Sequence, residues 1–432
     1  MGIKIRETRS VCPVCLKNLP ADLIRKEDGR IFLEKTCPDH GSYSVPVWQG
    51  KTDFDEWLLG TGPLQKDMGK NCPENCGICS EHEVGSCCTL LEVTERCNLR
   101  CRFCFADGGK TVSDPSLEEM KAAIREIAEK CGGPLLQLSG GEPTLRDDLP
   151  ELVRYAKEAG CSYVQVNTNG IRIAEEPDYA KRLAEAGLDI VFLQFDGTRN
   201  EIFEALRGKP LLETKLKAIQ VCSDLHMGVT LVPTVVKGVN TDNLGELVKL
   251  AASLAPGVRG VHFQPVSYFG RIPNNPGEED RYTLDQLMAD ISEQAGVSIE
   301  SFMPSRCDHP LCGFHAKYMI RQDGTLKSLT SITHSSKKRG CATDNREYVA
   351  RHWSRPEEEK KPEGNLSEEM DFDTFLYYLR HKSIALSAMA FQDAMNLNIE
   401  RLHSCTLHVY DQGKIKPFCA KYLSAFDVAG EN

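Results

Sequence analysis

Three cysteines stand close together in the run Cys-Asn-Leu-Arg-Cys-Arg-Phe-Cys-Phe-Ala, at Cys97, Cys101 and Cys104. Gaps of three and two residues allow one short loop to hold three corners of a cubane [4Fe–4S] cluster. A fourth cysteine at similar spacing is absent, so one iron would lack a protein thiolate and could bind a small molecule. A four-cysteine ferredoxin only carries electrons. The spacing therefore predicts a cluster that takes part in chemistry.

Another cysteine group precedes the first and repeats its spacing. Cys72, Cys76 and Cys79 again leave gaps of three and two residues, and Cys87-Cys88 begins eight residues later. Four thiolates predict a complete auxiliary [4Fe–4S] site. We favour Cys87 as the fourth ligand because Cys88 begins an apolar strand, and Cys88 stays open as the alternative. The repeat also allows this group to hold the open iron, but motifs farther along the chain favour the first group.

Ligands for a mononuclear metal lie near the N-terminus, in the pairs Cys12-Pro-Val-Cys15 and Cys37-Pro-Asp-His40. Two such knuckles, with a short β-like stretch between them, resemble a zinc ribbon or a rubredoxin. Three thiolates and one imidazole can close a tetrahedral site around Zn²⁺ or Fe. Such a site has no open position, so we expect a structural or electron-transfer role. Cysteines packed without metal are the alternative.

The last third of the chain holds a further cysteine set, Cys307, Cys312, Cys405 and Cys419. These four can enclose a third [4Fe–4S] cluster if the two halves of this region meet, with Cys341 as a spare ligand. Packed, unligated cysteines are the alternative. The chain has 19 cysteines, and its first residues, Met-Gly-Ile-Lys-Ile-Arg-Glu, do not resemble a signal peptide, so we expect metal ligation and no disulfides.

Glycine and polar residues at two further places suit a ligand pocket. In the run Gly140-Gly141-Glu142-Pro143, the glycines let the backbone approach a ligand, and Glu142 offers a carboxylate to an ammonium group. The amides of Asn167 and Asn169 can bond ribose hydroxyls or a carboxylate, although a turn also explains them.

Four more polar residues extend the set of candidates. Gln194 and Asp196 stand in Leu-Gln-Phe-Asp-Gly, where Asp196 can instead cap a helix. His262 and Gln264 occupy a later apolar run, and such a histidine is more often a satisfied core residue than a catalyst. We assign no catalytic residue from the sequence.

Alternating strands and helices must position these residues. Short apolar runs of the buried parallel type recur between residues 89 and 300. The predicted strands are Thr89–Thr94, Leu135–Ser139, Tyr163–Asn167, Ile190–Phe195, Val229–Val236 and Gly260–Val266. Ser116-Leu-Glu-Glu119 and Thr283-Leu-Asp-Gln286 predict capping boxes at two helix starts.

About six β–α units predict an α/β fold, a partial (β/α)6 TIM-type barrel with chemistry at the C-terminal ends of its strands. The cluster loop follows the first strand, as this rule requires. We expect four segments: a rubredoxin-like or zinc-ribbon-like metal knuckle (1–60), an auxiliary cluster segment (61–88), the partial barrel (89–300) and a C-terminal iron–sulfur extension (301–432). The charged stretch from residue 351 to 369 is expected as an exposed loop.

Composition limits the partners. The net charge of −10 argues against broad nucleic-acid binding, which needs a basic face. No apolar run approaches the length of a transmembrane helix, so we expect a cytoplasmic protein. Peripheral contact with a membrane surface stays open.

The cluster loop, with an aromatic residue before its third cysteine, and the later Gly-Gly-Glu-Pro run resemble the radical S-adenosylmethionine (SAM) superfamily. The resemblance implies that the open iron binds the amino and carboxylate groups of SAM, and that Gly140–Pro143 contacts the amino group. It implies that the reduced cluster cleaves SAM to a 5′-deoxyadenosyl radical, which takes hydrogen from an unactivated carbon. A ferredoxin or flavodoxin type of donor would supply the electron. Residues expected to complete the SAM pocket are Asn167, Asn169, Gln194 and Asp196.

The complete order of cysteine motifs, ending in Pro-Phe-Cys419, resembles a multi-cluster subgroup that contains archaeal tetraether lipid synthase. Some of its members are described as pterin dimethyltransferases. The resemblance implies three [4Fe–4S] clusters, a mononuclear Fe or Zn, and carbon–carbon bond formation on a lipid-like substrate such as a tetraether or membrane-spanning lipid. Methylation of a pterin-like heterocycle or modification of a peptide is the alternative. A non-enzymatic electron carrier is a further alternative, against which the missing fourth thiolate argues.

Overall fold

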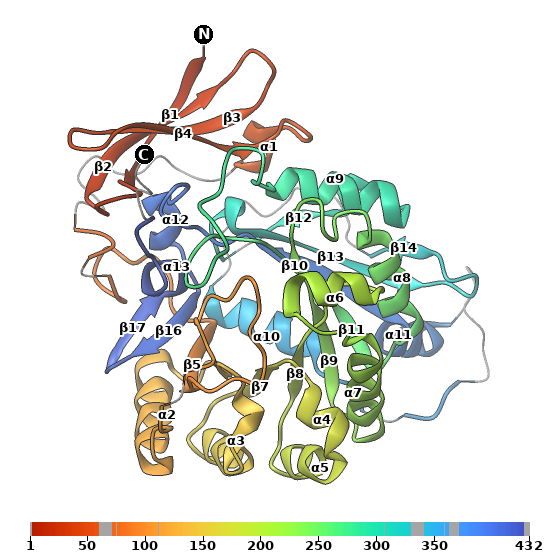
Figure 1. Cartoon of the computed structure of the whole chain (residues 1–432). Helices are drawn as coiled ribbons and strands as arrows, with labels where there is room; N and C mark the ends of the chain where they lie inside the picture. The colour runs from red at the N-terminus through yellow and green to blue at the C-terminus, as the bar shows by residue number, and fades with distance from the viewer. Residues whose placement is uncertain are drawn as a thin grey trace.

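The computed structural model describes residues 2–59, 71–74, 76–110, 112–305, 307–329, 341–357, 359–362 and 371–426. Two sheets organise them (Figure 1). The smaller is an antiparallel N-terminal sheet in the order β1-β2-β3-β4. Its strands are β1 (Ile3–Val11), β2 (Asn18–Arg25), β3 (Ile31–Cys37) and β4 (Gly41–Trp48), followed by the short helix α1 (Phe54–Trp57).

The larger sheet contains the predicted barrel. Six parallel strands lie side by side in chain order, which confirms the α/β partial barrel. They are β5 (Cys88–Thr94), β6 (Leu135–Gly140), β7 (Tyr163–Thr168), β8 (Ile190–Gln194), β9 (Gly228–Val232) and β11 (Val258–Pro265). The fifth predicted strand is divided: Pro233, which lacks an N–H, separates β9 from β10 (Thr234–Val235).

Strands from the C-terminal third extend both edges of this sheet. Beyond β11 the order continues with β15, β13 and β12, β14 pairs with β13, and beyond β5 it continues with β16 and β17. β15 runs parallel to β11, and β16 runs parallel to β5. These strands are β12 (Met303–Pro304), β13 (Gly313–Ile320), β14 (Leu326–Ser328), β15 (Ser383–Met389), β16 (Leu407–Asp411) and β17 (Lys414–Pro417).

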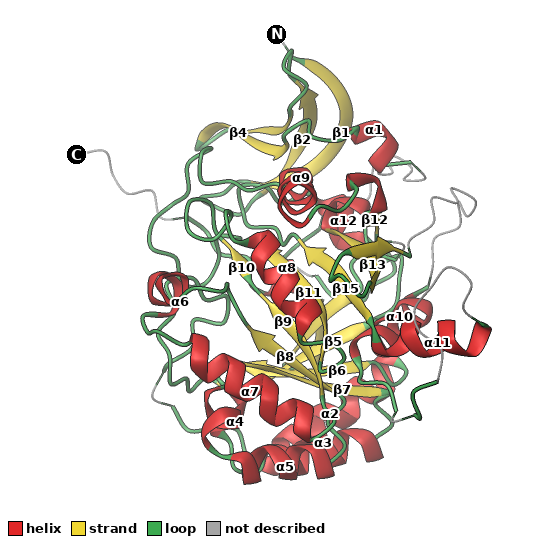
Figure 2. Ribbon diagram, turned by 90° about the vertical axis from the view of Figure 1, so that its right-hand side faces the viewer, coloured by secondary structure: helices red, strands yellow, loops and turns green. Residues whose placement is uncertain are grey.

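Helices cover the outer face of the barrel strands (Figure 2). They are α2 (Leu117–Cys131), α3 (Leu149–Glu158), α4 (Ile171–Glu175), α5 (Pro177–Glu185), α6 (Asn200–Arg207), α7 (Leu212–Asp224), α8 (Leu244–Ser253) and α9 (Leu284–Ala295). The predicted capping box at Ser116 and Glu119 is present. The one predicted at Thr283 is wrong, because Thr283 Oγ1 donates to Asp285 Oδ1 at 2.6 Å instead of capping α9.

The helix α10 (Ala342–Trp353) lies across the N-terminal ends of the barrel strands. Arg346 donates to the carbonyl oxygens of Gly132 at 2.9 Å, Gly133 at 2.6 Å and Ser86 at 3.0 Å, which precede β6 and β5. The loop expected from residue 351 therefore begins later than predicted, since α10 extends to Trp353, and residues 358 and 363–370 lie outside the described residues. Three further helices are α11 (Phe372–His381), α12 (Ile399–His403) and α13 (Phe418–Lys421).

Buried polar contacts join the N-terminal sheet to the rest of the chain. Lys35 on β3 donates from Nζ to Ser10 Oγ at 2.9 Å and to the carbonyl oxygens of Ala394 at 2.8 Å and Met395 at 2.7 Å. Asp285 on α9 accepts hydrogen bonds from the backbone N–H groups that follow β4. The two sheets therefore pack through satisfied polar groups. Within the described ranges, no helix is long and apolar enough to span a bilayer.

The buried ammonium of Lys35 predicts a pH-dependent stability. Burial lowers the pKa of Lys35 from 10.5 to about 7. Between these values the unfolded chain binds more protons than the folded chain, so the free energy of unfolding should rise with pH from about 7 to about 10.5. In Lys35→Met this rise should be absent. Urea midpoints at pH 7 and pH 9 measure it, with the exposed Lys51→Met as control. An unchanged pH slope in Lys35→Met would contradict the assignment.

Candidate active site

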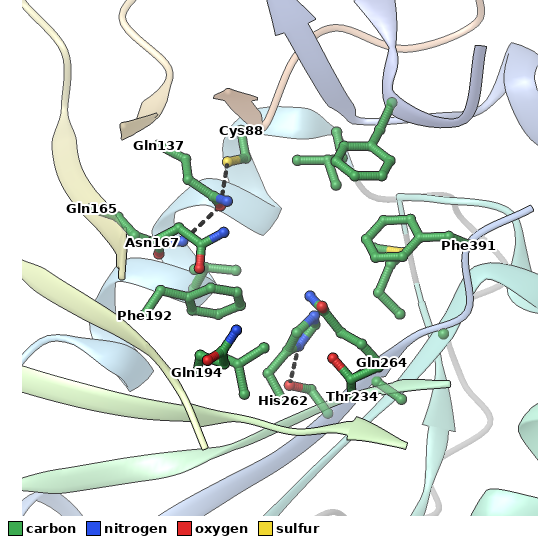
Figure 3. A pocket seen from close by; sticks show the side chains of 18 of the residues that line it. Cys88, Gln137, Gln165, Asn167, Phe192, Gln194, Thr234, His262, Gln264 and Phe391 are labelled. Carbon is green, nitrogen blue, oxygen red and sulfur yellow. Dashed lines mark hydrogen bonds between the residues drawn. The ribbon is translucent and has the colours of Figure 1, made fainter. Parts of the chain in front are cut away.

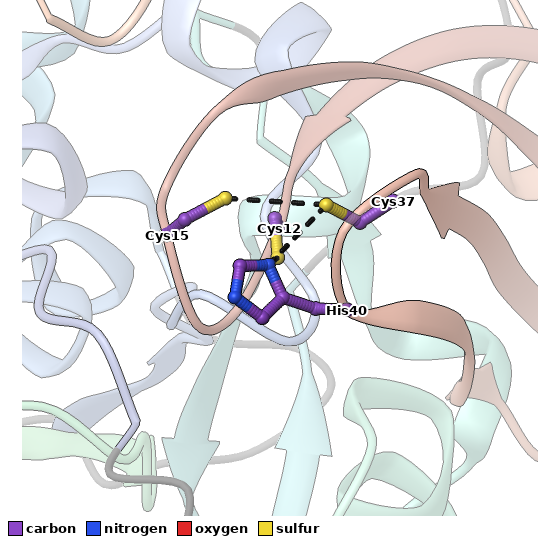
Figure 4. Close-up of side chains that lie close together, drawn as sticks. All are labelled: Cys12, Cys15, Cys37 and His40. Carbon is purple, nitrogen blue, oxygen red and sulfur yellow. Dashed lines mark hydrogen bonds between the residues drawn. The ribbon is translucent and has the colours of Figure 1, made fainter.

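The four N-terminal candidates come together as predicted for a metal centre. One ligand atom from each of Cys12, Cys15, Cys37 and His40 lies within 4.8 Å of all the others (Figure 4). Cys15 Sγ and Cys37 Sγ are 4.0 Å apart, and His40 Nδ1 lies 3.6 Å from Cys12 Sγ. A tetrahedral ion with metal–sulfur bonds near 2.3 Å separates its sulfur ligands by about 3.8 Å. The donor set and its spacing fit one Zn²⁺ or Fe ion.

The predicted cluster loop lies at the C-terminal end of β5. Cys97, Cys101 and Cys104 all line one cavity of about 990 Å³ inside the barrel. Arg271 stabilises the loop with three hydrogen bonds. Its backbone N–H and carbonyl group bond those of Cys104, and its Nε donates to the carbonyl oxygen of Cys101 at 3.0 Å. No sequence pattern indicated Arg271, which lies more than 160 residues away from the loop that it contacts.

The Gly-Gly-Glu-Pro run packs directly against the cluster loop. Gly140 has φ +121°, and a Cβ there would lie 2.2 Å from the carbonyl oxygen of Thr94. A Cβ on Gly141 would lie 2.1 Å from the carbonyl oxygen of Arg96. Only glycine allows this approach of the two backbones. With three thiols and this close-packed run on one cavity, the donor set fits a SAM-binding [4Fe–4S] cluster.

Glu142 is the hydrogen-bond centre of the pocket rather than a free carboxylate. Its Oε1 accepts from Thr144 Oγ1 and Thr168 Oγ1, both at 2.6 Å, and its Oε2 accepts from the backbone N–H of Asn169 at 2.7 Å. The side chain lines the cavity but is 1% exposed. Glu142 therefore joins the ends of β6 and β7, and its contact with a ligand ammonium stays a prediction.

The amide candidates lie on the same wall. Asn167, Asn169 and Gln194 line the cavity. Asn169 Nδ2 donates to Asn98 Oδ1 in the cluster loop at 2.7 Å, and Gln194 Nε2 lies 4.0 Å from Cys101 Sγ. Asn169 and Gln194 therefore lie against the cluster loop, and the contacts of all three residues with SAM stay predictions. Pro143, which was predicted with them, does not line the cavity.

Asp196 does not line the cavity either, and its partner Arg207 does. Asp196 accepts two hydrogen bonds from the guanidinium of Arg207, with Nε at 2.7 Å and Nη2 at 2.5 Å. Arg207 ends α6, and nothing in the sequence pattern singled it out. Asp196 therefore holds a cation beside the cluster loop, instead of capping a helix or meeting the ligand itself.

A second buried cation, Lys215 on α7, lies behind the pocket. Its Nζ donates to the carbonyl oxygen of Asn169 at 2.6 Å and to Gln194 Oε1 at 3.3 Å. Burial lowers the pKa of Lys215 to about 8, although the nearby Asp196 carboxylate opposes the shift. Lys215 thus fixes two of the predicted SAM contacts from outside the cavity, and the sequence did not reveal it.

The candidate ligands of the auxiliary clusters lie in two regions, on the cavity wall and outside it. Cys87 and Cys307 line the cavity, at the end covered by α10. Asn345 on α10 donates from Nδ2 to Cys87 Sγ at 3.5 Å, and Cys307 Sγ donates to the carbonyl oxygen of Cys341 at 3.0 Å. Cys88 lines the cavity as well, so the choice between Cys87 and Cys88 stays open.

The other auxiliary candidates lie outside the cavity wall. They are Cys72, Cys76, Cys79, Cys312, Cys405 and Cys419. Cys72 Sγ lies 3.6 Å from His403 Nε2, and the nearby thiol of Cys72, burial and the charge of Cys405 raise the pKa of Cys76. Cys405 therefore lies near the Cys72 group. The predicted ligand sets of the auxiliary clusters stay predictions.

Comparisons with known proteins agree with this geometry. Residues 91–251 match the radical SAM superfamily, and residues 4–49 match the HMPTM N-terminal zinc ribbon domain. The 7,8-dihydro-6-hydroxymethylpterin dimethyltransferase of Methanocaldococcus jannaschii is 32% identical, over 96% of this chain and 92% of the relative. A probable GTP 3′,8-cyclase of Thermococcus kodakarensis is 34% identical over 38% of this chain and 52% of the relative.

The solved structure of Streptococcus suis SuiB with its precursor peptide SuiA is similar with a TM-score of 0.42 and 16% identity, over 50% of this chain and 48% of that chain. The sequence matches and the cluster loop define the class: this protein is a radical SAM enzyme. Within that superfamily, the chain belongs to the family of the Methanocaldococcus jannaschii protein.

The N-terminal centre yields one prediction. Cys12→Ala should lose one equivalent of mononuclear Zn or Fe and keep the cluster iron, because Cys12 Sγ is one of four clustered donors that lie apart from the cavity. Metal analysis with absorption spectroscopy on anaerobic protein measures both. Cys161→Ala, a buried cysteine outside every predicted ligand set, is the control. A loss of cluster iron in Cys12→Ala alone would refute the separation of the two sites.

The buried ammonium of Lys215 predicts an effect on SAM binding. Lys215→Met should weaken SAM binding about tenfold or more, since a hydrogen bond from a charged group to a buried acceptor is worth roughly 1.5–3 kcal/mol. Equilibrium binding of SAM to cluster-loaded protein measures the effect. The exposed Lys217→Met on the same helix should bind SAM like the parent protein. Equal affinities for the two variants would rule out a positioning role.

Proposed function

We propose that this radical SAM enzyme modifies a carbon atom of a pterin-like heterocycle held inside the barrel, with methylation as the reaction. The relative that matches almost the whole chain is named a 7,8-dihydro-6-hydroxymethylpterin dimethyltransferase. The resemblance predicted carbon–carbon bond formation on a lipid-like substrate, with methylation of a pterin-like heterocycle as the alternative, and the name of this relative supports the alternative. The sequence matches show that the chain belongs to the radical SAM superfamily, and the substrate and the product are proposed.

The observation that carries the proposal is the lining of the cavity. Its volume of about 990 Å³ reaches the upper end of the range for small-molecule sites, which leaves room for a cofactor and a second small molecule. Polar side chains point inward from neighbouring strands, among them Gln137, Gln165, Asn167 and Gln264 (Figure 3). Such a wall suits a ring with several hydrogen-bonding atoms.

A lipid-like substrate is the competing proposal. A hydrocarbon chain in this cavity would cover the same amides without offering them partners, and an unpaired buried amide costs roughly 1–3 kcal/mol. A pterin ring offers both donors and acceptors. The cavity lining is mostly apolar, but its buried amides favour the heterocycle over the tetraether or membrane-spanning lipid and give a peptide no particular support.

The cluster cysteines, Arg271 and His262 have separate proposed roles. Cys97, Cys101 and Cys104 would hold the cluster, and Arg271 keeps their loop closed. When bound there, SAM on the reduced cluster supplies a 5′-deoxyadenosyl radical that abstracts hydrogen from carbon. Burial lowers the pKa of His262 to about 3, so its imidazole stays neutral and can hydrogen-bond a substrate without adding charge.

The other metal groups and the reductant belong to the same proposal. Three [4Fe–4S] clusters and one mononuclear metal are proposed, and the positions of Cys87 and Cys307 on the cavity wall support an auxiliary cluster close to the substrate. A small electron-transfer protein of the ferredoxin or flavodoxin type is the proposed source of the electron.

The first test concerns SAM cleavage. Cys101→Ala should abolish 5′-deoxyadenosine formation and lower the iron content, because a missing ligand destabilises the cluster. Anaerobic protein with dithionite and SAM, analysed by chromatography, measures the product. Cys222→Ala, buried in α7 and outside every predicted set, is the matched control. Persistent cleavage in Cys101→Ala would refute the assignment of the loop.

The substrate is tested with the same preparation. Adding 7,8-dihydro-6-hydroxymethylpterin should increase 5′-deoxyadenosine formation and yield a pterin in which one or more C–H hydrogens are replaced by methyl. A second SAM molecule would supply each methyl group and leave as S-adenosylhomocysteine, and dithionite would supply one electron for SAM cleavage and one for forming the new carbon–carbon bond. Stimulation by a diether lipid, with no effect of the pterin, would replace the proposal by its competitor.

A further inference from the structure

Two glutamines form a paired amide on the inner wall of the barrel. Gln137 on β6 and Gln165 on β7 are partners in the register of the two parallel strands. Gln165 Nε2 donates to Gln137 Oε1 at 2.8 Å, and Cys88 Sγ approaches the same oxygen at 3.9 Å (Figure 3). These contacts fix the orientation of both amides, since the shared oxygen accepts from two sides.

The pair leaves one acceptor and one donor unused. Gln165 Oε1 is buried and has no hydrogen-bond partner among the described residues, and the side chain is 1% exposed. Gln137 lines the cavity and is 8% exposed, and its Nε2 donates to no acceptor among the described residues. A buried amide oxygen is nearly always satisfied, so the unpaired Gln165 Oε1, on a residue that lines the cavity, indicates a ligand.

We infer that Gln137 and Gln165 recognise the amino-oxo edge of a fused pyrimidine ring. Gln165 Oε1 accepts a hydrogen bond from a ring or amino N–H, and Gln137 Nε2 donates one to the neighbouring carbonyl oxygen. This inference rests on the proposed function, and it names the chemical group that the site reads: a 2-amino-4-oxopyrimidine edge. Asn167, two residues beyond Gln165 on the same face of β7, lies next along this wall.

Aromatic side chains nearby suit a flat ring. Phe192 and Trp353 are stacked, with centroids 5.5 Å apart and an interplanar angle of 28°. The ring centroid of His262 lies 5.4 Å from the ring centroid of each of them, and all three side chains line the cavity. Planar ligands are commonly held by such faces, while the amides at the edge determine orientation. Trp353 comes from α10, so the C-terminal third completes the barrel interior.

Two kinds of molecule carry this edge. Pterins have it, and so does the guanine of a guanine nucleotide, on which relatives named GTP 3′,8-cyclase are described as acting. The glutamine pair recognises only the edge that pterins and guanine share. The remainder distinguishes the two sources: a nucleotide brings a triphosphate, and a pterin does not.

The test measures binding to anaerobic, cluster-loaded protein in the presence of SAM. The probes are 7,8-dihydro-6-hydroxymethylpterin, GTP, and 2,4-diamino-6-hydroxymethyl-7,8-dihydropteridine, which differs from the first probe only in that an amino group replaces the oxo group. The parent protein should bind the pterin at least tenfold more tightly than the diamino analogue, because Gln137 Nε2 cannot donate to an amino group.

The variants separate the pair from the fold. Gln137→Glu keeps the oxygen that Gln165 and Cys88 contact but removes the donor, and Gln165→Leu removes the acceptor. Each should weaken pterin binding about tenfold. The exposed Gln220→Leu on α7 is the matched control and should bind the pterin like the parent.

Each outcome decides something different. Tight pterin binding that neither variant weakens overturns the role of the glutamine pair and leaves the proposed function standing. Binding of GTP alone, weakened by both variants, supports the pair and overturns the pterin substrate. Binding of neither probe by the parent protein overturns both.

Discussion

The close approach of two backbone segments at the C-terminal ends of β5 and β6 is the constraint on which the active site depends. Gly140 and Gly141 touch the carbonyl oxygens of Thr94 and Arg96 so closely that no side chain fits between them. This contact places the loop with the cluster cysteines against the start of the Gly-Gly-Glu-Pro run. The Glu142 carboxylate then joins this run to the end of β7, so the ends of β5, β6 and β7 are held together by the glycine contact and this carboxylate.

Buried charge supports this arrangement from behind. Arg207 and Lys215 bring two cations beside the cluster loop, and Asp196 holds the first in a two-point ion pair. Removing one partner of such a pair leaves the other charge buried and uncompensated, which is far costlier than losing a surface pair. These charged groups therefore hold fixed positions around the pocket before any ligand binds. Lys215 donates hydrogen bonds to the backbone carbonyl oxygen of Asn169 and to the side-chain oxygen of Gln194, and so positions both residues.

The C-terminal third completes the barrel instead of standing beside it. Its strands continue the sheet on both edges, and α10 covers the ends of the barrel strands opposite the cluster loop. The cavity thus runs from the cluster cysteines to Cys87 and Cys307. Both groups of thiols therefore face the same cavity.

Local spacing in the sequence determined the cluster loop, the N-terminal knuckles and six barrel strands, because each depends on residues a few positions apart. Tertiary structure alone decided which distant residues complete these elements. Arg271 closes the cluster loop, Lys215 supports Asn169, and Trp353 enters the barrel interior, although none of them stands in a recognisable motif. The pairing of Gln137 with Gln165 required the register of β6 and β7. A strand's own pattern shows which face is buried, but which side chains meet across that face depends on how separate strands align.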